Sequence, residues 1–427
     1  MKLPKKIIRI LKILGPGFIT GAADDDPSGI ASYSQTGAQF GYGQLWMALF
    51  SFPFMTIVQE MCARIGMVTG EGLSGIIKKH YSKRILYVAV TLLLIANTIN
   101  IGADLGAMAS AAELILGIPY IVWLLGLTAL ILILEIFVSY KNYARFLKYL
   151  TFSLFAYILT AFIVKQDWTN VLHETFIPSF SLNKEYLMNI VAILGTTISP
   201  YMFFWQASEE VEEKQEHCKV ILTGKCGDVE AITGGEVQDM RLDTAVGMLF
   251  SNLIMFFIIV TTASTLGSHG ITQVETATQA AQALRPLAGN FAFLLFAVGI
   301  IGTGLLAVPI LAGSAAYAVS EALSWQAGLD KKFVKALGFY GVIIVATIIG
   351  VTINFSSIKP FTMLYYTAII NGIVAPPLLV LVMLISNNKK IMGKYVNGGF
   401  SNIMGWMVTI IMAIASIAFL ISLVYGG

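Results

Sequence analysis

The stretch GPGFITGAADDDPSGIASYSQTGAQFGYG, residues 15–43, decides the fold of this chain. It is long enough to cross a bilayer, yet three consecutive aspartates, Asp24 to Asp26, stand near its middle and are followed by Pro27. Proline lacks the N–H that a helix needs, and Gly29 tolerates backbone angles that other residues avoid. Because a carboxylate at the bilayer centre costs at least ~2.5–3.5 kcal/mol on insertion scales, the stretch predicts a membrane helix broken around a polar site.

Two plainer roles remain open for these aspartates. Asp26 can act as the N-cap of the second half of the helix, and Asp24 or Asp25 can lie shallower, in a vestibule. Capping and cation binding are compatible, because a carboxylate at a helix break can face both N–H groups and an ion.

The composition places the rest of the chain in the membrane as well. Of the 427 residues, 57% are hydrophobic and 12% are charged, whereas a soluble domain carries about 25% charged residues. We therefore predict an all-α membrane protein with eleven spans, each near the ~20 residues that a bilayer requires. The expected limits are 13–40, 44–68, 85–113, 119–139, 143–164, 186–208, 243–267, 290–322, 334–353, 361–386 and 402–425.

The positive charges predict the orientation of these spans. With the N-terminus in the cytoplasm, 22 of the 27 Lys and Arg residues fall in cytoplasmic segments and four fall in outside loops. Cytoplasmic loops carry such an excess, so we expect an integral protein of a prokaryotic cell membrane with its N-terminus inside and its C-terminus outside. The charges are spread over many loops, so no basic patch supports nucleic-acid binding.

A second break is expected in the sixth span, within LGTTISPYMFFWQASEE, residues 194–210. Pro200 stands at mid-span after several hydroxyl residues, and a simple proline kink is the plainer alternative. Five spans between two broken helices is the spacing of a five-plus-five inverted repeat, the LeuT-like architecture with its site between the breaks. We expect one transmembrane domain over 1–427, with repeat one at about 13–164, repeat two at about 186–386 and an extra helix at about 402–425.

The longest expected loop covers about 209–242, and the sequence does not decide its structure. It begins with four glutamates, at 209, 210, 212 and 213. We interpret this run as a solvated helix end, with the attraction of cations to a cytoplasmic mouth as the alternative.

The groups at the two breaks suit a hard cation. They offer carboxylate, hydroxyl and carbonyl oxygens, which favour Mg²⁺, Ca²⁺ or Mn²⁺, and no His or Cys lies near either break. In span 3, Asp104 belongs either to a substrate pathway or to a structural hydrogen bond. In span 10, Asn371 is a weaker candidate ligand. In span 2, Glu60 and Arg64 have the spacing of an i, i+4 ion pair.

The two breaks together resemble the Nramp family of divalent-metal transporters. The segments GPGF, DPSG and TGAQFGYGQLW are similar to that family's first-helix region, where the break reads Asp-Pro-Gly-Asn. Ser199-Pro200-Tyr201 is similar to the family's Met-Pro-His segment. The eleven spans and the inside N-terminus agree with this resemblance over nearly the whole chain.

The resemblance implies a metal site and points to one branch of the family. Gly29 stands where the family has an asparagine ligand, and Ser199 replaces a methionine whose soft sulfur favours transition metals. Tyr201 replaces a histidine linked to proton transport, and Ala107 replaces a glutamate of the proton path. This pattern resembles the Nramp-related magnesium transporters. The candidate metal ligands are Asp26, Gly29, Thr196 and Ser199, and further candidates for the site or pathway are Asp25, Tyr201, Asp104 and Asn371.

We therefore expect a secondary carrier that imports Mg²⁺, and Mn²⁺, by alternating access without proton coupling. The alternative is a proton-coupled importer of Mn²⁺ or Fe²⁺, the ordinary function of the family. A Na⁺-coupled carrier of amino acids is less consistent with an aspartate-rich break, and no arrangement of residues typical of a membrane enzyme is present. The metal ion is expected as substrate, with no resident cofactor, and the bilayer is the other partner; no obligate protein partner is evident.

Overall fold

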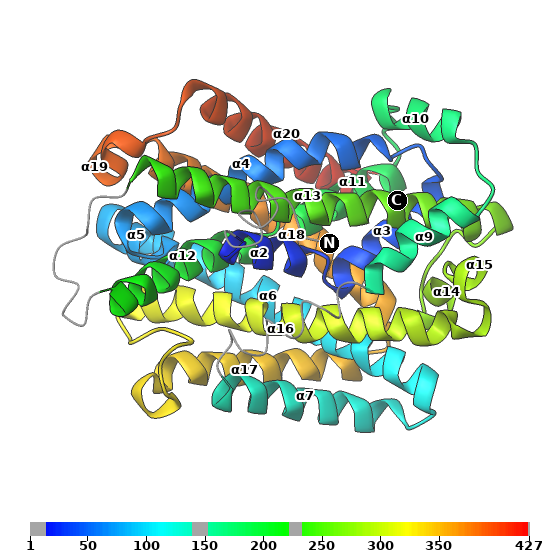
Figure 1. Cartoon of the computed structure of the whole chain (residues 1–427), viewed down its shortest axis with the longest axis horizontal. Coiled ribbons are helices and arrows are strands. Elements are labelled where there is room, and N and C mark those ends of the chain that lie inside the picture. Colours follow the sequence, from blue (N-terminus) through cyan, green and yellow to red (C-terminus); the bar gives the residue numbers. More distant parts are fainter. Residues whose placement is uncertain (1–13, 139–152, 222–232, 426–427) are drawn as a thin grey trace, which may run out of the picture.

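The computed structural model describes residues 14–138, 153–221 and 233–425. In these ranges the chain is built from helices and short turns, without a strand. The long helices run side by side in one bundle (Figure 1). Nine helical stretches of the described ranges are long and apolar enough to cross a membrane. The architecture agrees with the predicted all-α membrane protein.

Most predicted spans correspond to single long helices. Three predicted spans differ. The first and the sixth are each divided into two half-helices. The fifth, predicted at 143–164, begins outside the described residues and ends in α9 (Phe155–Ile163). The other long helices are α4 (Trp46–Thr69), α6 (Lys83–Leu116), α7 (Tyr120–Phe137), α13 (Gly234–Thr265), α16 (Ala292–Leu323), α17 (Leu337–Thr352), α18 (Pro360–Ser386) and α20 (Gly399–Tyr425). The connections contain α5 (Leu73–His80), α10 (Trp168–Phe176), α14 (Ala277–Gln282), α15 (Arg285–Ala288) and α19 (Lys389–Met392), with single 3₁₀ turns at Gly267–His269, Gly289–Phe291, Phe333–Lys335, Ile353–Phe355 and Gly393–Tyr395.

Both predicted helix breaks are present. The first span consists of α2 (Pro16–Asp24) and α3 (Pro27–Phe40), and the sixth consists of α11 (Lys184–Thr197) and α12 (Pro200–Ile221). Each second half begins with a proline, which is favourable at the first helical position because its missing N–H would have no helical partner there. The two prolines therefore start the second half-helices as well as ending the first ones.

The expected loop 209–242 is largely helical, which corrects the prediction. Helix α12 continues to Ile221 and α13 begins at Gly234, so only 222–233 lies between them, and 222–232 is outside the described residues. The hydroxyl of Thr233 and the carboxylate of Glu236 form a capping box that starts α13 early.

The glutamates at the end of the sixth span are not all solvated, contrary to our interpretation. The residues Glu209 and Glu210 are only 8% and 6% exposed, because α12 packs against α4 and α16. Gln206 donates a hydrogen bond of 3.1 Å to Glu210. The predicted pair in span 2 is confirmed: Glu60 accepts from Arg64 at 3.0 Å.

The half-helices before the breaks pack against other helices backbone to backbone. A methyl group built on Gly21 of α2 would lie 2.3 Å from the carbonyl oxygen of Gly247 on α13. One built on Gly195 of α11 would lie 2.0 Å from the carbonyl oxygen of Ala368 on α18. Small residues allow membrane helices to approach this closely, so α2 and α11 are each held against a neighbouring long helix.

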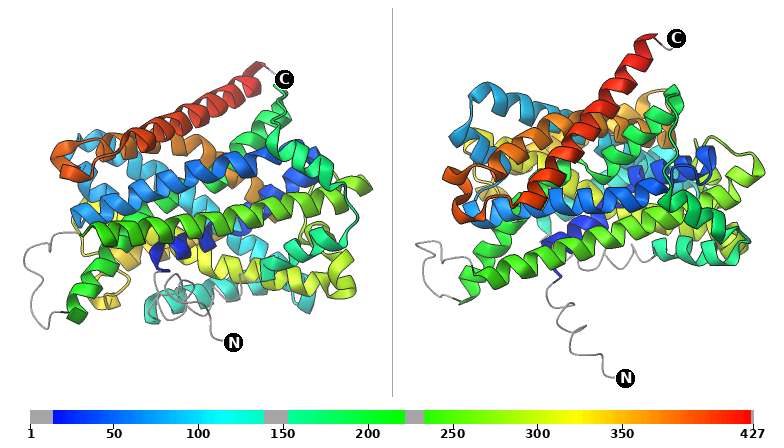
Figure 2. Two further views of the ribbon diagram at one scale, coloured as in Figure 1. Left: turned by 45° about the horizontal axis from the view of Figure 1, so that its top comes forward. Right: turned by 90° about the horizontal axis from the view of Figure 1, so that it is seen from above.

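The outermost helices present apolar side chains to the surroundings. Helices α7 and α17 lie together at one edge of the bundle, and α20 lies at the opposite edge, where it contacts α18, α11 and α4 (Figures 1 and 2). Only 28% of the most apolar window of α7, and of α20, is buried. Exposed apolar helices of this kind suit a lipid environment, with the broken helices shielded at the centre.

Candidate functional site

The first break holds Asp26 by hydrogen bonds from two helices. Asp26 is the N-cap of α3: its Oδ1 accepts from the backbone N–H of Gly29 at 2.7 Å and from the hydroxyl of Ser28 at 2.6 Å. Its Oδ2 accepts from Nδ2 of Asn100 on α6 at 3.2 Å. The predicted capping role is confirmed. Since an ionised carboxylate has about four acceptor positions, Asp26 retains capacity toward a cation.

Gly29 contributes to the site because it has no side chain, and not because of an unusual backbone angle. It lies in the first turn of α3 and does not adopt a positive φ, so the break itself is at Asp25 and Asp26. A methyl group at Gly29 would lie 3.1 Å from the carbonyl oxygen of Asp24 and 3.2 Å from Oγ1 of Thr196. The missing side chain therefore lets the end of α2, the start of α3 and the end of α11 meet.

The second break exposes carbonyl groups that a hydroxyl partly satisfies. The hydroxyl of Ser199 lies 2.6 Å from the carbonyl oxygen of Gly195 and 2.9 Å from that of Thr196. One hydroxyl hydrogen cannot fully satisfy both carbonyls, because Ser has a single O–H donor. Ser199 and Thr196 thus form one oxygen-rich cluster at the end of α11, and both side chains are buried.

Tyr201 ties the two breaks together. Its phenol donates a hydrogen bond of 3.1 Å to the carbonyl oxygen of Ala23 in α2. Its own backbone carbonyl accepts from the hydroxyl of Ser314 on α16 at 2.8 Å. Because the last carbonyls of a helix lack partners within the helix, the phenol satisfies one of them and joins α12 to the end of α2.

Asp104 lies near the first break but forms no hydrogen bond with it. It follows Asn100 by one helical turn on α6, so the two side chains lie on the same face. Its side chain is fully buried, and neither carboxylate oxygen has a hydrogen-bond partner among the described residues. The structure therefore places an unsatisfied carboxylate one turn from the amide that holds Asp26.

Asn371 lies on the helix that supports α11. It is buried on α18, and its Nδ2 has no hydrogen-bond partner within the described ranges. The next residue, Gly372, packs against the carbonyl of Val191 on α11. Asn371 is thus beside the sixth span, and no hydrogen bond joins it to Asp26 or Ser199.

Sequence reasoning missed two polar residues that bind the first break from other helices. Asn100 bonds Asp26, and Ser251 on α13 donates to Oδ2 of Asp24 and lies 3.3 Å from Oδ1 of Asp25. Each of these two residues could have been noticed from its neighbours in the sequence. Asn100 stands one turn before Asp104 in the same polar stretch, and Ser251 interrupts an apolar span.

A third missed residue, Asp243, caps the start of α2. Its carboxylate accepts from the backbone N–H groups of Gly15 at 2.9 Å, Gly17 at 2.7 Å and Phe18 at 3.1 Å. A carboxylate at a helix N-terminus also interacts favourably with the helix dipole. Asp243 therefore fixes the far end of α2 to α13, on the side where Gly21 and Gly247 touch.

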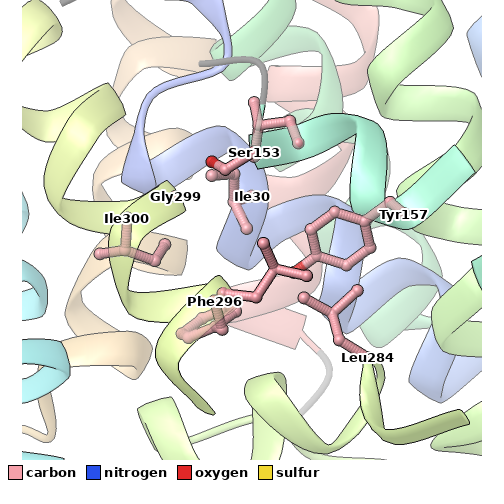
Figure 3. A pocket seen from close by; sticks show the side chains of 9 residues that line it. Ile30, Ser153, Tyr157, Leu284, Phe296, Gly299 and Ile300 are labelled. Atoms are coloured by element: carbon pink, nitrogen blue, oxygen red, sulfur yellow. The ribbon is translucent and has the colours of Figure 1, made fainter. Parts of the chain in front are cut away.

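The cavity of Figure 3 is separate from the breaks and does not suit a cation. It lies between α3, α9 and α16, and its lining is mostly hydrocarbon. The lining residues are Ile30, Ser153, Leu154, Tyr157, Leu284, Leu295, Phe296, Gly299 and Ile300. An ion in this cavity would lose its bound water, and few polar groups would replace that water as ligands.

The polar groups at the breaks can attract a cation but do not form a ready cage of side chains. In the described part of the chain, no three His, Cys, Asp or Glu side chains converge as metal ligands. The C-terminal ends of α2 and α11 carry partial negative charge from the helix dipole. A cation between the breaks would therefore be held by a mixed set of carboxylate, carbonyl and hydroxyl oxygens, completed by water.

Comparison with known proteins adds independent information. Residues 17–422 match the family model described as natural resistance-associated macrophage protein-like. A divalent metal cation transporter MntH from Clostridium acetobutylicum is 27% identical over 433 residues, covering 96% of this chain and 91% of that protein. A protein of the same name from Caldanaerobacter subterraneus subsp. tengcongensis is 25% identical over 419 residues, covering 94% and 90%.

Solved structures show the same fold. The manganese transporter of Eremococcus coleocola, in complex with an aromatic bis-isothiourea substituted compound, superposes with a TM-score of 0.75 at 17% identity, covering 99% of this chain and 88% of that one. Mhp1, a nucleobase-cation-symport-1 family transporter in a closed conformation, superposes with a TM-score of 0.56 at 13% identity, covering 95% and 91%. The LeuT-like fold predicted from the two breaks is confirmed.

Proposed function

The chain belongs to the Nramp family of natural resistance-associated macrophage protein-like proteins, and from this premise we propose that it transports hard divalent cations, Mg²⁺ and Mn²⁺, by alternating access. As a member of this family it is a divalent metal cation transporter of the MntH type and not an enzyme. The metal is its substrate. The finer proposal concerns which ions it prefers and whether protons accompany them.

The observation that carries the preference for hard ions is the oxygen-only chemistry between the breaks. Asp26 supplies a carboxylate, Ser199 a hydroxyl, and the end of α11 supplies carbonyl groups. Ser199 stands where the resemblance places a methionine, so the thioether sulfur that would bind a soft metal is absent. Carboxylate, carbonyl and water oxygens are the ligands that Mg²⁺ and Mn²⁺ prefer.

Gly29 supports the retention of water by the bound ion. Mg²⁺ releases its water reluctantly and usually keeps several molecules. A larger side chain at Gly29 would meet the carbonyl of Asp24 and the hydroxyl of Thr196. We propose that the space beside Gly29 widens when the breaks separate and is then occupied by water bound to the ion.

We further propose that transport occurs without stoichiometric proton flux. A proton path needs a chain of groups that are charged and neutral in turn. Tyr201 is engaged with the carbonyl of Ala23, and Ala107 cannot carry a proton, so only Asp104 remains of the proton-path residues that the resemblance implies. The driving force is then the metal gradient plus the membrane potential, worth ~2.3 kcal/mol per charge per 100 mV and about twice that for a divalent ion.

The orientation of the chain in the membrane is also part of the proposal. The distribution of Lys and Arg favours a cytoplasmic N-terminus, which would put α2 on the cytoplasmic side of the first break and α3 on the outer side. Import then means that the ion reaches Asp26 past α3 and leaves past α2.

A second candidate function is a proton-coupled importer of transition metals. The relatives favour a transition metal as substrate, since the protein of similar structure is a manganese transporter and the proteins of similar sequence are divalent metal cation transporters. The buried, unpartnered Asp104 is the residue that could hold the proton.

Uptake into liposomes that contain the purified protein separates the two candidates. Mg²⁺, Mn²⁺, Ca²⁺ and Cd²⁺ are supplied outside, and a pH dye is trapped inside. We expect Mg²⁺ and Mn²⁺ to enter in response to an imposed potential while the dye stays constant, with weak competition by Cd²⁺. Acidification that follows Mn²⁺ uptake and disappears in Asp104→Asn would establish the second candidate instead. Liposomes with Asp26→Ala protein serve as the control for leakage.

A further inference from the structure

Two carboxylates beside the proposed site are not used by it. Asp24 is the last residue of α2 and Asp25 follows it, and both side chains are fully buried. Ser251 of α13 is the recorded hydrogen-bond partner of both. A serine has one hydroxyl hydrogen, so it cannot satisfy two carboxylates at once.

The charge of this pair has no compensation from the protein. Oδ1 of Asp24 and Oδ2 of Asp25 have no hydrogen-bond partner among the described residues. The carboxylates of Glu60, Glu71, Glu174 and Glu275, in contrast, each have a basic side chain within 4.0 Å. Two adjacent buried carboxylates repel each other strongly at low dielectric, so the pair stays charged only while a cation from outside the protein lies beside it, and otherwise takes up protons.

The backbone connects this pair directly with the proposed site. The carbonyl oxygen of Asp24 faces the position beside Gly29 where Thr196 also lies, while the side chain of Asp24 reaches Ser251. One residue therefore borders both places: its carbonyl faces the meeting point of the breaks, and its carboxylate faces α13.

We propose that Asp24, Asp25 and Ser251 form a second cation site on the α2 side of the first break, which receives the divalent ion from Asp26. This inference rests on the proposed function in that the ion is the transported one. Two carboxylate oxygens and a hydroxyl are hard ligands, and a hydrated Mg²⁺ or Mn²⁺ ion fits them. While the ion is bound at this second site, it neutralises the charges of Asp24 and Asp25. Asp26 is then free to bind the next divalent ion.

The binding test uses Mn²⁺ and purified full-length protein in which Asp26 is replaced by Asn. This variant lacks the proposed first site, so any remaining specific binding reports the second. We expect Mn²⁺ to bind to Asp26→Asn protein and to raise its apparent melting temperature. Adding Asp24→Asn and Asp25→Asn should weaken this binding by about tenfold or more, because affinity for hard cations follows the number of charged ligands.

Two controls separate a cation site from a structural role. Glu135→Gln removes another buried carboxylate, on α7 away from the breaks, and should leave Mn²⁺ binding unchanged. Ser251→Ala removes the hydroxyl but keeps both carboxylates, so it should retain binding within about threefold of the Asp26→Asn parent. If Ser251→Ala abolishes binding as fully as the two Asn replacements do, the carboxylates act only through their contact with α13 and the proposal fails.

Transport gives the second readout. With Asp26 intact, Asp24→Asn together with Asp25→Asn should lower Mg²⁺ and Mn²⁺ uptake by about tenfold. Uptake at the parent rate, or absence of Mn²⁺ binding to the Asp26→Asn protein, would overturn the second site while leaving the proposed function intact. If Asp26→Ala itself transports normally, the first site has been misplaced, and if the parent protein takes up neither Mg²⁺ nor Mn²⁺, it is the proposed function that fails.

Discussion

The break between α2 and α3 and the break between α11 and α12 share a backbone plan and differ in side-chain chemistry. Each interrupts a membrane span, and each starts its second half with a proline. The first carries three aspartates that are bonded by Asn100 of α6 and Ser251 of α13. The second carries no carboxylate, and its main polar contact is the hydroxyl of Ser199 turned back onto the carbonyls of α11.

This difference separates two properties of a transport site. Attraction for a divalent ion comes from full charges, and these stand at the first break only. Discrimination between hard and soft ions depends on the neutral ligands and on the space around the ion. A substitution at the second break changes both of these and leaves the carboxylates of the first break intact. The following predictions test this separation.

Asp26→Ala should have the largest effect. Removing a carboxylate from a low-dielectric site takes away several kcal/mol of attraction for a divalent ion, so uptake of Mg²⁺ and Mn²⁺ should fall by about a hundredfold or more. Ion uptake by liposomes measures it, with Glu135→Gln as a matched control for loss of a buried carboxylate. Transport at the parent rate would show that the charge at the first break is not the attractor.

Gly21→Ala and Gly195→Ala test whether both half-helices are held in the same way. Added methyl groups would lie 2.3 Å from the carbonyl of Gly247 and 2.0 Å from that of Ala368, and overpacking costs about 1–3 kcal/mol. Both variants should have a lower apparent melting temperature. Gly126→Ala on α7, where a methyl group meets nothing within 4 Å, is the control and should be no less stable. A strong effect at only one of the two breaks would show that they are supported differently.

Ser199→Met should change the selectivity between ions more than the total rate of ion uptake. A thioether adds a soft ligand and fills space that a hydrated ion needs, so the ratio of Cd²⁺ to Mg²⁺ uptake should rise by about tenfold. Competition between the two ions during uptake provides the measurement, and Ser199→Ala is the control for the loss of the hydroxyl. An equal loss of both ions would mean steric damage and would remove the argument that the second break filters ions.

Tyr201→Phe should have the smallest effect. It removes the hydrogen bond to Ala23 and leaves a buried carbonyl unpaired, which costs about 1–3 kcal/mol of stability, while the aromatic ring still fills its place. We expect Mg²⁺ uptake within about threefold of the parent and an unchanged dependence of uptake on external pH. A lost or shifted pH profile would instead identify Tyr201 as part of a proton path.

The sequence predicted the parts of this arrangement that are local. The two breaks, the cap formed by Asp26 and the pair of Glu60 with Arg64 depend on neighbouring residues, and the structure has all three. Only the expected backbone role of Gly29 in the break was misjudged, because a glycine soon after a proline looks like a hinge whether or not its φ becomes positive. In the structure Gly29 is helical, and its value is the space it leaves.

The contacts between distant helices could not be predicted. Asn100, Ser251 and Asp243 bond residues that precede or follow them by 74 to 228 positions, and nothing in a single sequence specifies which face of a long apolar helix meets which neighbour. The helical ends of the segment 209–242 were missed for another reason. Helices α12 and α13 continue beyond the apolar spans, where hydropathy no longer marks them. The metal ligands themselves stay predictions.

The cap that Asp243 places on α2 has a consequence for the pace of transport. Any opening between α2 and α13 has to release three N–H groups from one carboxylate, and bonds of this charged type contribute about 1.5–3 kcal/mol each when fully lost. Water replaces part of these bonds as the gap opens, and each ~1.4 kcal/mol of barrier that remains slows opening about tenfold. If α2 leaves α13 during the cycle, a single carboxylate far from the ion therefore slows the turnover of the carrier without contacting the ion.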